Sequence, residues 1–242
     1  MKSSSLFSPS PRLAWWLCLA FVTALSFTTY MVRYDQPQAF FWDENYHVAA
    51  AQKYLSGVYF MEQHPPLGKL LIAAGEALVD ANPIDNQFAD TDYARNPPPD
   101  FKFSGYRLFP ALLAWLTAPL LFISFWLIGR NLSVATFGAF LYAFDNALIV
   151  HSRGAMLESP LMFFSVATIL GFLLMLHNAD RKKELFLWSA VLFGAGFAAA
   201  VTTKVVGLIL ILLVPALLWI LWPKRQTVLK GLGAAALAFG VV

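Results

Sequence analysis

Long apolar runs separated by short polar segments make up most of this chain. A run of about 20 apolar residues can cross the hydrocarbon core of a membrane as an α-helix. The pattern predicts seven such runs, and the last one is still apolar where the sequence ends. Their ranges are 13–31, 106–128, 132–150, 159–176, 185–202, 205–222 and 228–242. We therefore expect an all-α polytopic membrane protein, with residues 1–242 forming one transmembrane module, 1–12 a cytoplasmic tail and 106–242 the spans after the first.

The first apolar run, 13–31, has a second interpretation as a cleaved signal peptide. Ala24, Leu25 and Ser26 loosely fit a small-residue cleavage site. The run is longer than the usual apolar core of a signal peptide, and more apolar runs follow it. We therefore interpret it as the first membrane span.

A polar segment over residues 33–103 interrupts the apolar runs and contains two shorter helical patterns. Side chains recur at helical spacing over 46–54 and again over 67–78. We expect two amphipathic helices on the membrane face, with Lys69 on the solvent side of the second. Residues 82–100 are rich in Asn, Asp and Pro and predict an irregular, mobile surface segment.

The composition excludes a typical soluble domain. Hydrophobic residues make up 59% of the chain and charged residues only 13%, whereas soluble domains have about 25% charged residues. The one cysteine, Cys18, cannot form a disulfide within the chain. The sequence has neither a Cys/His cluster with metal-ligand spacing nor a basic patch of the kind that binds nucleic acid.

The distribution of charge predicts the orientation of the spans. If the amino terminus is cytoplasmic, that side receives nine of the 17 basic residues and two acidic ones. The bases are Lys2, Arg12, Arg130, Arg181, Lys182, Lys183, Lys224, Arg225 and Lys230, and the acids are Asp180 and Glu184. Because short cytoplasmic loops carry an excess of Lys and Arg, the large loop over 33–103 is expected to be extracytoplasmic.

The remaining polar residues of interest gather at the opposite, loop-side ends of the spans. They are Asp43, Glu44, His64, Arg107, Asp145, Asn146, Arg153, Glu158 and Lys204. A charge at the centre of a span costs roughly 2.5 to 3.5 kcal/mol, so such residues tend to be paired or functional. Their presence at one face predicts a polar site at the outer membrane surface.

Transfer of a sugar from a lipid phosphate to a hydroxyl group would use this mixture of charges. The acceptor hydroxyl needs a carboxylate base, and Asp43 is the candidate. The departing phosphate is already anionic and needs cations, for which Arg107, Lys204 and Arg153 are the candidates. Glycoside hydrolysis fits less well, because it usually divides the work between two carboxylates.

Several of these residues also have a purely structural interpretation. Acidic residues favour the amino-terminal end of a helix dipole, so Asp43, Glu44 and Glu158 could cap helices. Long cationic side chains can reach lipid headgroups, which applies to Arg107 and Lys204.

The other candidates are also open. His64 precedes two prolines, and we interpret it as a turn residue rather than a proton carrier. Asp145 and Asn146 could hold helix ends together or touch substrate. Asp43, His47 and His64 could in principle hold a divalent ion, but the sequence does not indicate a metal site and we expect no cofactor.

Five segments together resemble the protein O-mannosyltransferases. They are the Asp43-Glu44 pair, HPPLGKLLIA, Tyr106-Arg107-Leu108, DNALIVHSRGAMLESPLMFF and TTKVVGL. These enzymes are polytopic glycosyltransferases of the GT-C class, which use polyprenyl-phosphate (dolichyl-phosphate) mannose as donor. The resemblance implies a GT-C bundle of transmembrane helices whose large first extracytoplasmic loop contains the amphipathic helices.

The resemblance also implies a reaction and its participants. It implies inverting transfer of mannose from the lipid carrier, a substrate rather than a cofactor, to Ser or Thr of proteins at the extracytoplasmic face. Asp43 would be the catalytic base with Glu44 beside it, and Arg107 would lie near the lipid phosphate. Glu158 stands where the family more often has Asp. Family members are much longer, so the chain resembles the amino-terminal half of such an enzyme.

Two other function classes remain open at this stage. A related lipid-carrier transferase could move another sugar, such as an aminosugar, to a glycolipid, although His64 before the two prolines favours the protein-directed branch. A transporter or assembly factor would place polar residues near the middle of the spans, whereas here they gather at one rim.

Overall fold

The computed structural model describes residues 10–82 and 97–242, and all regular secondary structure in these two ranges is helical. Most of the irregular segment expected over 82–100 lies outside the described residues. The elements are α1 (Pro11–Tyr30), α2 (Glu44–Leu55), α3 (Leu67–Val79), α4 (Ser104–Gly129), α5 (Leu132–Phe144), α6 (Asn146–Arg153), α7 (Glu158–Asn178), α8 (Lys183–Thr203), η2 (Val205–Leu212), α9 (Leu213–Ile220), η3 (Trp222–Lys224) and α10 (Arg225–Val241).

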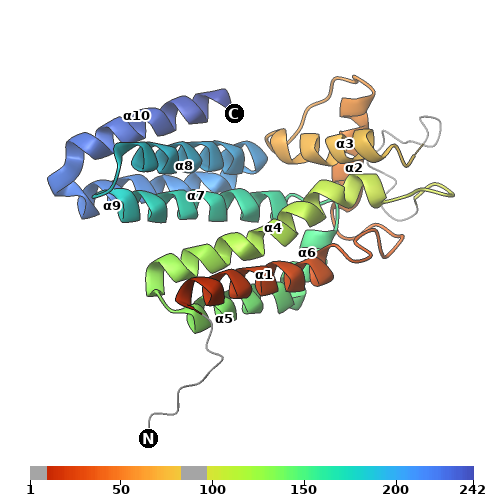
Figure 1. The fold of residues 1–242 in the computed structure, drawn as a ribbon. Helices are drawn as coiled ribbons and strands as arrows, with labels where there is room; N and C mark the ends of the chain where they lie inside the picture. The colour runs from red at the N-terminus through yellow and green to blue at the C-terminus, as the bar shows by residue number, and fades with distance from the viewer. Residues whose placement is uncertain (1–9, 83–96) are drawn as a thin grey trace, which may run out of the picture.

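The long helices form two packed groups that meet along α4 and α7 (Figure 1). In the first group, α1, α4 and α5 enclose a core that includes Tyr30, Phe122 and Tyr142. In the second, α7 to α10 enclose a core that includes Met175 and Phe186. The outward sides of these helices remain apolar, as expected for surfaces that face lipid.

Four helices are long and apolar enough to cross a membrane, namely α1, α4, α7 and α8. Two further pairs of helices pass the same test together but are bent, so the described residues contain four spans, or up to six if each bent pair is one span. The seven expected spans stay a prediction.

The first bent pair replaces the continuous helix expected over 132–150. Helices α5 and α6 meet at an angle of 59°. Asp145 lies at the break in extended conformation, and its carboxylate accepts a hydrogen bond from the backbone N–H of Leu148 at 2.9 Å. The carboxylate thereby caps the second helix, which explains why the run is broken at this polar residue.

The second bent pair corresponds to the last two expected spans, 205–222 and 228–242, and its bend falls between them. The chain forms the 3₁₀ segment η2 and then α9, and it bends by 86° before it continues as α10. Pro223 lies at this bend. Because proline has no backbone N–H and disfavours helix in the residue before it, the bend occurs at a natural helix boundary.

Both helices expected in the large loop are present, and they pack on one end of the bundle (Figure 1). Helices α2 and α3 share a core with the start of α4 and with the segment after α6. Gly75 of α3 lies against the backbone carbonyl of Gly105 in α4, a contact that a larger residue would prevent. Helices α2 and α3 therefore form a layer over the end of α4, and α3 also contacts α8.

Candidate active site

A buried ion pair between Glu44 and Arg107 lies where the loop meets the bundle. Arg107 donates from Nε to Oε1 of Glu44 at 2.6 Å and from Nη2 to Oε2 at 2.7 Å. The exposed fraction is 2% for the arginine side chain and 0% for the glutamate. The planar guanidinium matches the two carboxylate oxygens, so the start of α2 is fixed to the first turn of α4.

The other N–H groups of Arg107 bind the chain between α1 and α2. Nη1 donates to the carbonyls of Asp35 at 2.9 Å and Pro37 at 2.6 Å, and Nη2 donates to that of Ala39 at 2.7 Å. An arginine side chain has five N–H donors, and all five are used here. With all five donors bound within the described residues, Arg107 has none left over in this structure, and its predicted contact with the donor phosphate stays a prediction.

Glu44 is also fully engaged. The backbone N–H of Ala155 donates to Oε1 at 2.7 Å, and that of Phe41 donates to Oε2 at 3.1 Å. These bonds tie the start of α2 to the segment after α6 and to the chain before α2. The predicted place of Glu44 in the catalytic pair stays a prediction.

Asp43 has a different environment from its neighbour. It is exposed and occupies the residue before α2, but its side chain makes no capping hydrogen bond. The capping interpretation of Asp43 is therefore not supported by the structure. Its carboxylate remains open to solvent, while the adjacent Glu44 holds the backbone at this position in place.

A cavity of about 390 Å³ borders the segment that carries Asp43. Its lining comes from α6 and α7 and consists of Ala147, Leu148, His151, Ser152, Glu158, Leu161, Met162 and Ser165. The ring of His151 lies 5.4 Å from that of Phe41 and 6.3 Å from that of Trp42. These ring contacts place the residues just before Asp43 beside the cavity.

Glu158 and Lys204 form an ion pair at the same end of the bundle. Lys204 Nζ donates to Oε1 of Glu158 at 2.9 Å, and the side chains are 28% and 38% exposed, respectively. The second carboxylate oxygen of Glu158 and the hydroxyl of Ser159 are buried, and neither has a hydrogen-bond partner in the described part of the chain. The pair therefore has bonding capacity left, since the ammonium has three N–H donors.

Arg153 follows the cavity-lining Ser152 and is half-buried. Its Nη2 donates to the carbonyl of Val32 at 2.9 Å and also to that of Arg33. These bonds connect the end of α6 to the end of α1. Only one nitrogen of the guanidinium is used in this way, so Arg153 retains donors that Arg107 lacks.

A second charged group lies under the loop helices, and sequence reasoning did not find it. We call it the loop cluster, and it consists of His47, Glu62, His64 and Lys69. Lys69 forms an ion pair with Glu62, and its side chain is only 2% exposed. The expectation that Lys69 is solvated was wrong, because α3 is covered by α4 on one side and by the loop on the other.

The two histidines of the loop cluster are held neutral. Burial and the charge of Lys69 lower the pKa of His47 to about 4. Burial and the charges of Lys69 and Lys204 lower the pKa of His64 as well. The rings are 6.5 Å apart, and Asp43 is exposed while His47 is buried, so these three residues do not converge as metal ligands.

Asp145 and Asn146 lie at the α5–α6 break and are exposed. As described above, Asp145 caps α6, so a structural role accounts for it. His64 belongs to the loop cluster and is partly exposed. The structure thus groups the sequence candidates into a buried pair, a cavity with an ion pair at its edge, and a loop cluster.

Comparisons with known proteins match most of the chain, across both the loop and the bundle. A sequence profile described as dolichyl-phosphate-mannose-protein mannosyltransferase matches residues 20–242. Protein O-mannosyl-transferase 2 of Drosophila melanogaster is 28% identical over 209 residues, which cover 83% of this chain and 26% of the relative. Dolichyl-phosphate-mannose–protein mannosyltransferase 4 of Schizosaccharomyces pombe is 30% identical over 217 residues, which cover 85% of this chain and 27% of the relative.

The fold is similar to that of a solved complex. The Saccharomyces cerevisiae protein O-mannosyltransferase Pmt1-Pmt2 complex bound to the sugar donor has a TM-score of 0.77 with 24% sequence identity, covering 96% of this chain and 32% of the matched one. This likeness confirms the expected all-α GT-C-type fold, and with the apolar helices it identifies a multi-pass membrane protein. The chain spans about a quarter of the length of the curated relatives it matches.

Proposed function

Because this chain belongs to the dolichyl-phosphate-mannose-protein mannosyltransferase family, we propose that it carries the acceptor-activating site of an enzyme that mannosylates proteins. The donor is mannose on a polyprenyl-phosphate carrier, and the acceptors are Ser or Thr hydroxyl groups. The single observation that supports the site is the contrast between Asp43 and Glu44. The Asp43 carboxylate is free at the surface, whereas the buried Glu44 carboxylate binds Arg107 and holds the backbone next to Asp43.

The reaction would proceed as an inverting displacement. The acceptor hydroxyl loses its proton to the carboxylate of Asp43 as its oxygen bonds to the anomeric carbon of mannose. The bond between that carbon and the phosphate oxygen breaks at the same time, and polyprenyl phosphate departs with the electron pair. A positioned carboxylate base contributes about 10²- to 10⁴-fold to such a step.

Lys204 and Arg153 are the cations that we assign to the donor phosphate. Lys204 reaches the cavity edge through Glu158, and Arg153 directly follows the cavity-lining Ser152. Both retain N–H donors, and both are partly exposed, unlike Arg107. Donors aimed at the leaving phosphate stabilise the charge that develops there during transfer.

The site is proposed to face the extracytoplasmic side of the membrane. The short loops at the far end of the bundle carry Arg130, Arg181, Lys182, Lys183, Lys224 and Arg225. Cytoplasmic loops are enriched in such residues, so the end with the candidate site would be outside.

The test is transfer of labelled mannose from polyprenyl-phosphate mannose to a Ser/Thr-rich peptide by membranes that contain the full-length enzyme. We expect the Asp43→Asn variant to lose at least about 100-fold of this activity. Asp145→Asn is a matched control, because both aspartates are exposed and precede a helix, but only Asp145 makes a capping bond, which Asn can replace. Wild-type transfer by Asp43→Asn would exclude Asp43 as the base, and label in a glycolipid instead of the peptide would contradict the acceptor class.

A further inference from the structure

A cationic cavity lies at the end of the bundle opposite the candidate active site. It has a volume of about 490 Å³ and is lined by Pro11, Arg12, Trp15, Trp16, Trp126, Arg130 and Leu132. The residues come from the start of α1, the end of α4 and the start of α5. From Arg107 to the end of α4 at Gly129 the helix rises by roughly 33 Å at 1.5 Å per residue, so the cavity lies far from the candidate active site.

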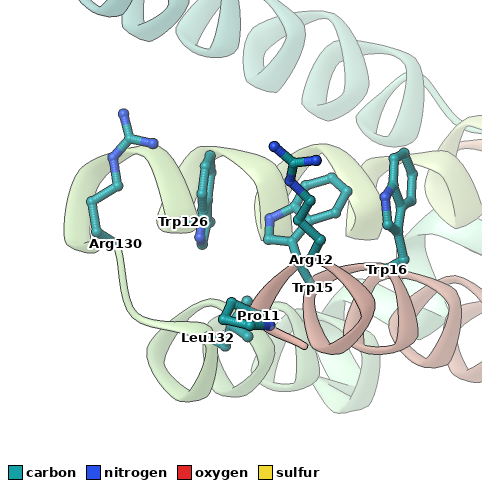
Figure 2. Close-up of a pocket in the computed structure, with 7 residues that line it drawn as sticks. All are labelled: Pro11, Arg12, Trp15, Trp16, Trp126, Arg130 and Leu132. Atoms are coloured by element: carbon teal, nitrogen blue, oxygen red, sulfur yellow. The ribbon is translucent and has the colours of Figure 1, made fainter. Parts of the chain in front are cut away.

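Two guanidinium groups supply the charge of this cavity, and none of its described lining residues is acidic. Figure 2 shows Arg12 and Arg130 on the same side of the helices, with the ring of Trp126 between them. The guanidinium of Arg130 lies 4.5 Å from the centre of that ring, and its Nη2 lies 2.6 Å from Nδ1 of His177. Both arginines are exposed, and Arg12 has no ion-pair partner within residues 10–82 and 97–242.

A buried indole N–H lines the same cavity. Nε1 of Trp15 is shielded from solvent and has no hydrogen-bond partner among the described residues. A buried N–H donor that is left unpaired costs free energy, and native structures seldom leave one so. Its ring is fixed by the rings of Trp16 and Trp126, whose centres lie at 4.7 and 5.8 Å. A small rotation of the Trp15 ring would expose this N–H to the cavity, where an anionic oxygen bound by the arginines would accept from it.

Two apolar grooves continue from the cavity along opposite sides of α1. The groove toward α5 has a volume of about 430 Å³, shares Leu132 with the cavity and also contains Cys18, Thr136 and Phe140. The groove toward α4 has a volume of about 700 Å³, shares Trp16 with the cavity and runs to Phe27 and Trp115. A cationic cavity with two apolar grooves matches a ligand that has one anionic group and two hydrocarbon chains.

We propose that this cavity binds the phosphate of an anionic glycerophospholipid, whose two acyl chains lie in the grooves on either side of α1. Basic pockets between transmembrane helices suit anionic headgroups, and tryptophan rings suit the membrane interface. A zwitterionic lipid would place a second cation beside two arginines, which disfavours it. A polyprenyl phosphate has one chain and would leave one groove unfilled. The bound lipid would join α1, α4 and α5 at their shared end.

The test uses the full-length protein purified in detergent and native mass spectrometry. Phosphatidylglycerol and phosphatidylcholine with identical acyl chains are added separately, and the bound fractions are compared. We expect retention of phosphatidylglycerol over phosphatidylcholine, and a loss of roughly fivefold in affinity for each of Arg12→Gln and Arg130→Gln. Arg225→Gln is the matched control, because Arg225 lies over the ring of Trp222 at 5.7 Å but outside the cavity, and it should bind phosphatidylglycerol like wild type.

Several outcomes would overturn the proposal. These are equal retention of the two lipids, equal loss in all three variants, and stronger retention of polyprenyl phosphate than of phosphatidylglycerol. Competition by inorganic phosphate as effective as that by the lipid would show that the grooves contribute nothing. If a glutamine variant does not fold by circular dichroism, the Trp15→Phe variant is tested instead, because it removes the indole N–H together with part of the ring, leaves both arginines in place and should still weaken phosphatidylglycerol binding.

Discussion

Arg107 binds Glu44 through two hydrogen bonds, and this pair fixes the position of the neighbouring Asp43. The same guanidinium binds three backbone carbonyls in the chain that leads from α1 to α2. One side chain from the second long helix therefore holds the loop from two sides. The carboxylate assigned to catalysis needs no partner of its own, since its backbone is held by its neighbour.

Replacement of Arg107 by lysine should lower the free energy of unfolding by about 3 kcal/mol, because the lysine ammonium cannot hydrogen-bond to Glu44 and to three carbonyls at once. The loss would appear as a lower free energy of unfolding in detergent. Arg225→Lys should change it by less than about 0.5 kcal/mol, because Arg225 is exposed. Equal stabilities of the two variants would show that the buried network is not formed.

Removal of either partner of the ion pair between Glu62 and Lys69 should have unequal effects. The Glu62 side chain is 22% exposed and can be rehydrated, whereas Lys69 is 2% exposed and cannot. Glu62→Gln leaves a buried cation unpaired, which costs about 3 kcal/mol or more. Lys69→Met should cost less, because the methionine fills the buried space without a charge. Thermal unfolding of both variants checks the order, and a larger loss in Lys69→Met would contradict it.

The close contact between α3 and α4 depends on Gly105. A Cβ atom added there would overlap the carboxylate of Glu76 and would lie 2.7 Å from its Cα atom. Gly105→Ala should therefore cost about 1 to 3 kcal/mol through overpacking. Gly129→Ala in the same helix is the control, because its Cβ would meet nothing within 4 Å. Protease sensitivity of the loop should rise in the first variant and not in the second.

His47 should make the stability depend on pH. Its pKa falls from 6.5 to about 4 on folding, because burial and Lys69 disfavour the charged ring. The unfolded chain therefore binds more protons between these values, so stability is complete above pH 6.5 and declines as the pH falls toward 4. The full loss is about 3 kcal/mol at 1.4 kcal/mol per pH unit. Unfolding of His47→Gln between pH 4 and 7 should show a smaller slope than wild type, and an unchanged slope would exclude His47 as its source.

The spans and the two loop helices could be predicted because their signals are local. Apolar runs of membrane length and helical spacing in the loop depend only on neighbouring residues. The break at Asp145 also had a local signal, since Asp followed by Asn within an apolar run favours a helix cap. A span was nevertheless predicted across it, because the run has the length of one crossing.

The partners of the charged side chains could not be predicted in the same way. Arg107 is saturated largely by backbone carbonyls, and no residue type in the sequence marks a carbonyl as an acceptor. Lys69 lies opposite the apolar side of α3, and only the packed structure shows that this side is covered too. In both cases, segments far apart in the chain decide whether the cationic side chain is free or already bound within the protein.

The 63 residues between Glu44 and Arg107 also set an order of assembly during synthesis. The segment with Asp43 leaves the ribosome well before the helix that will hold it. Until α4 is inserted, Glu44 has no counter-ion and the carbonyls at 35, 37 and 39 have no common donor. Insertion of this second long helix into the membrane is therefore also the event that completes the proposed site, so a nascent chain arrested earlier would be membrane-bound without the pair between Glu44 and Arg107.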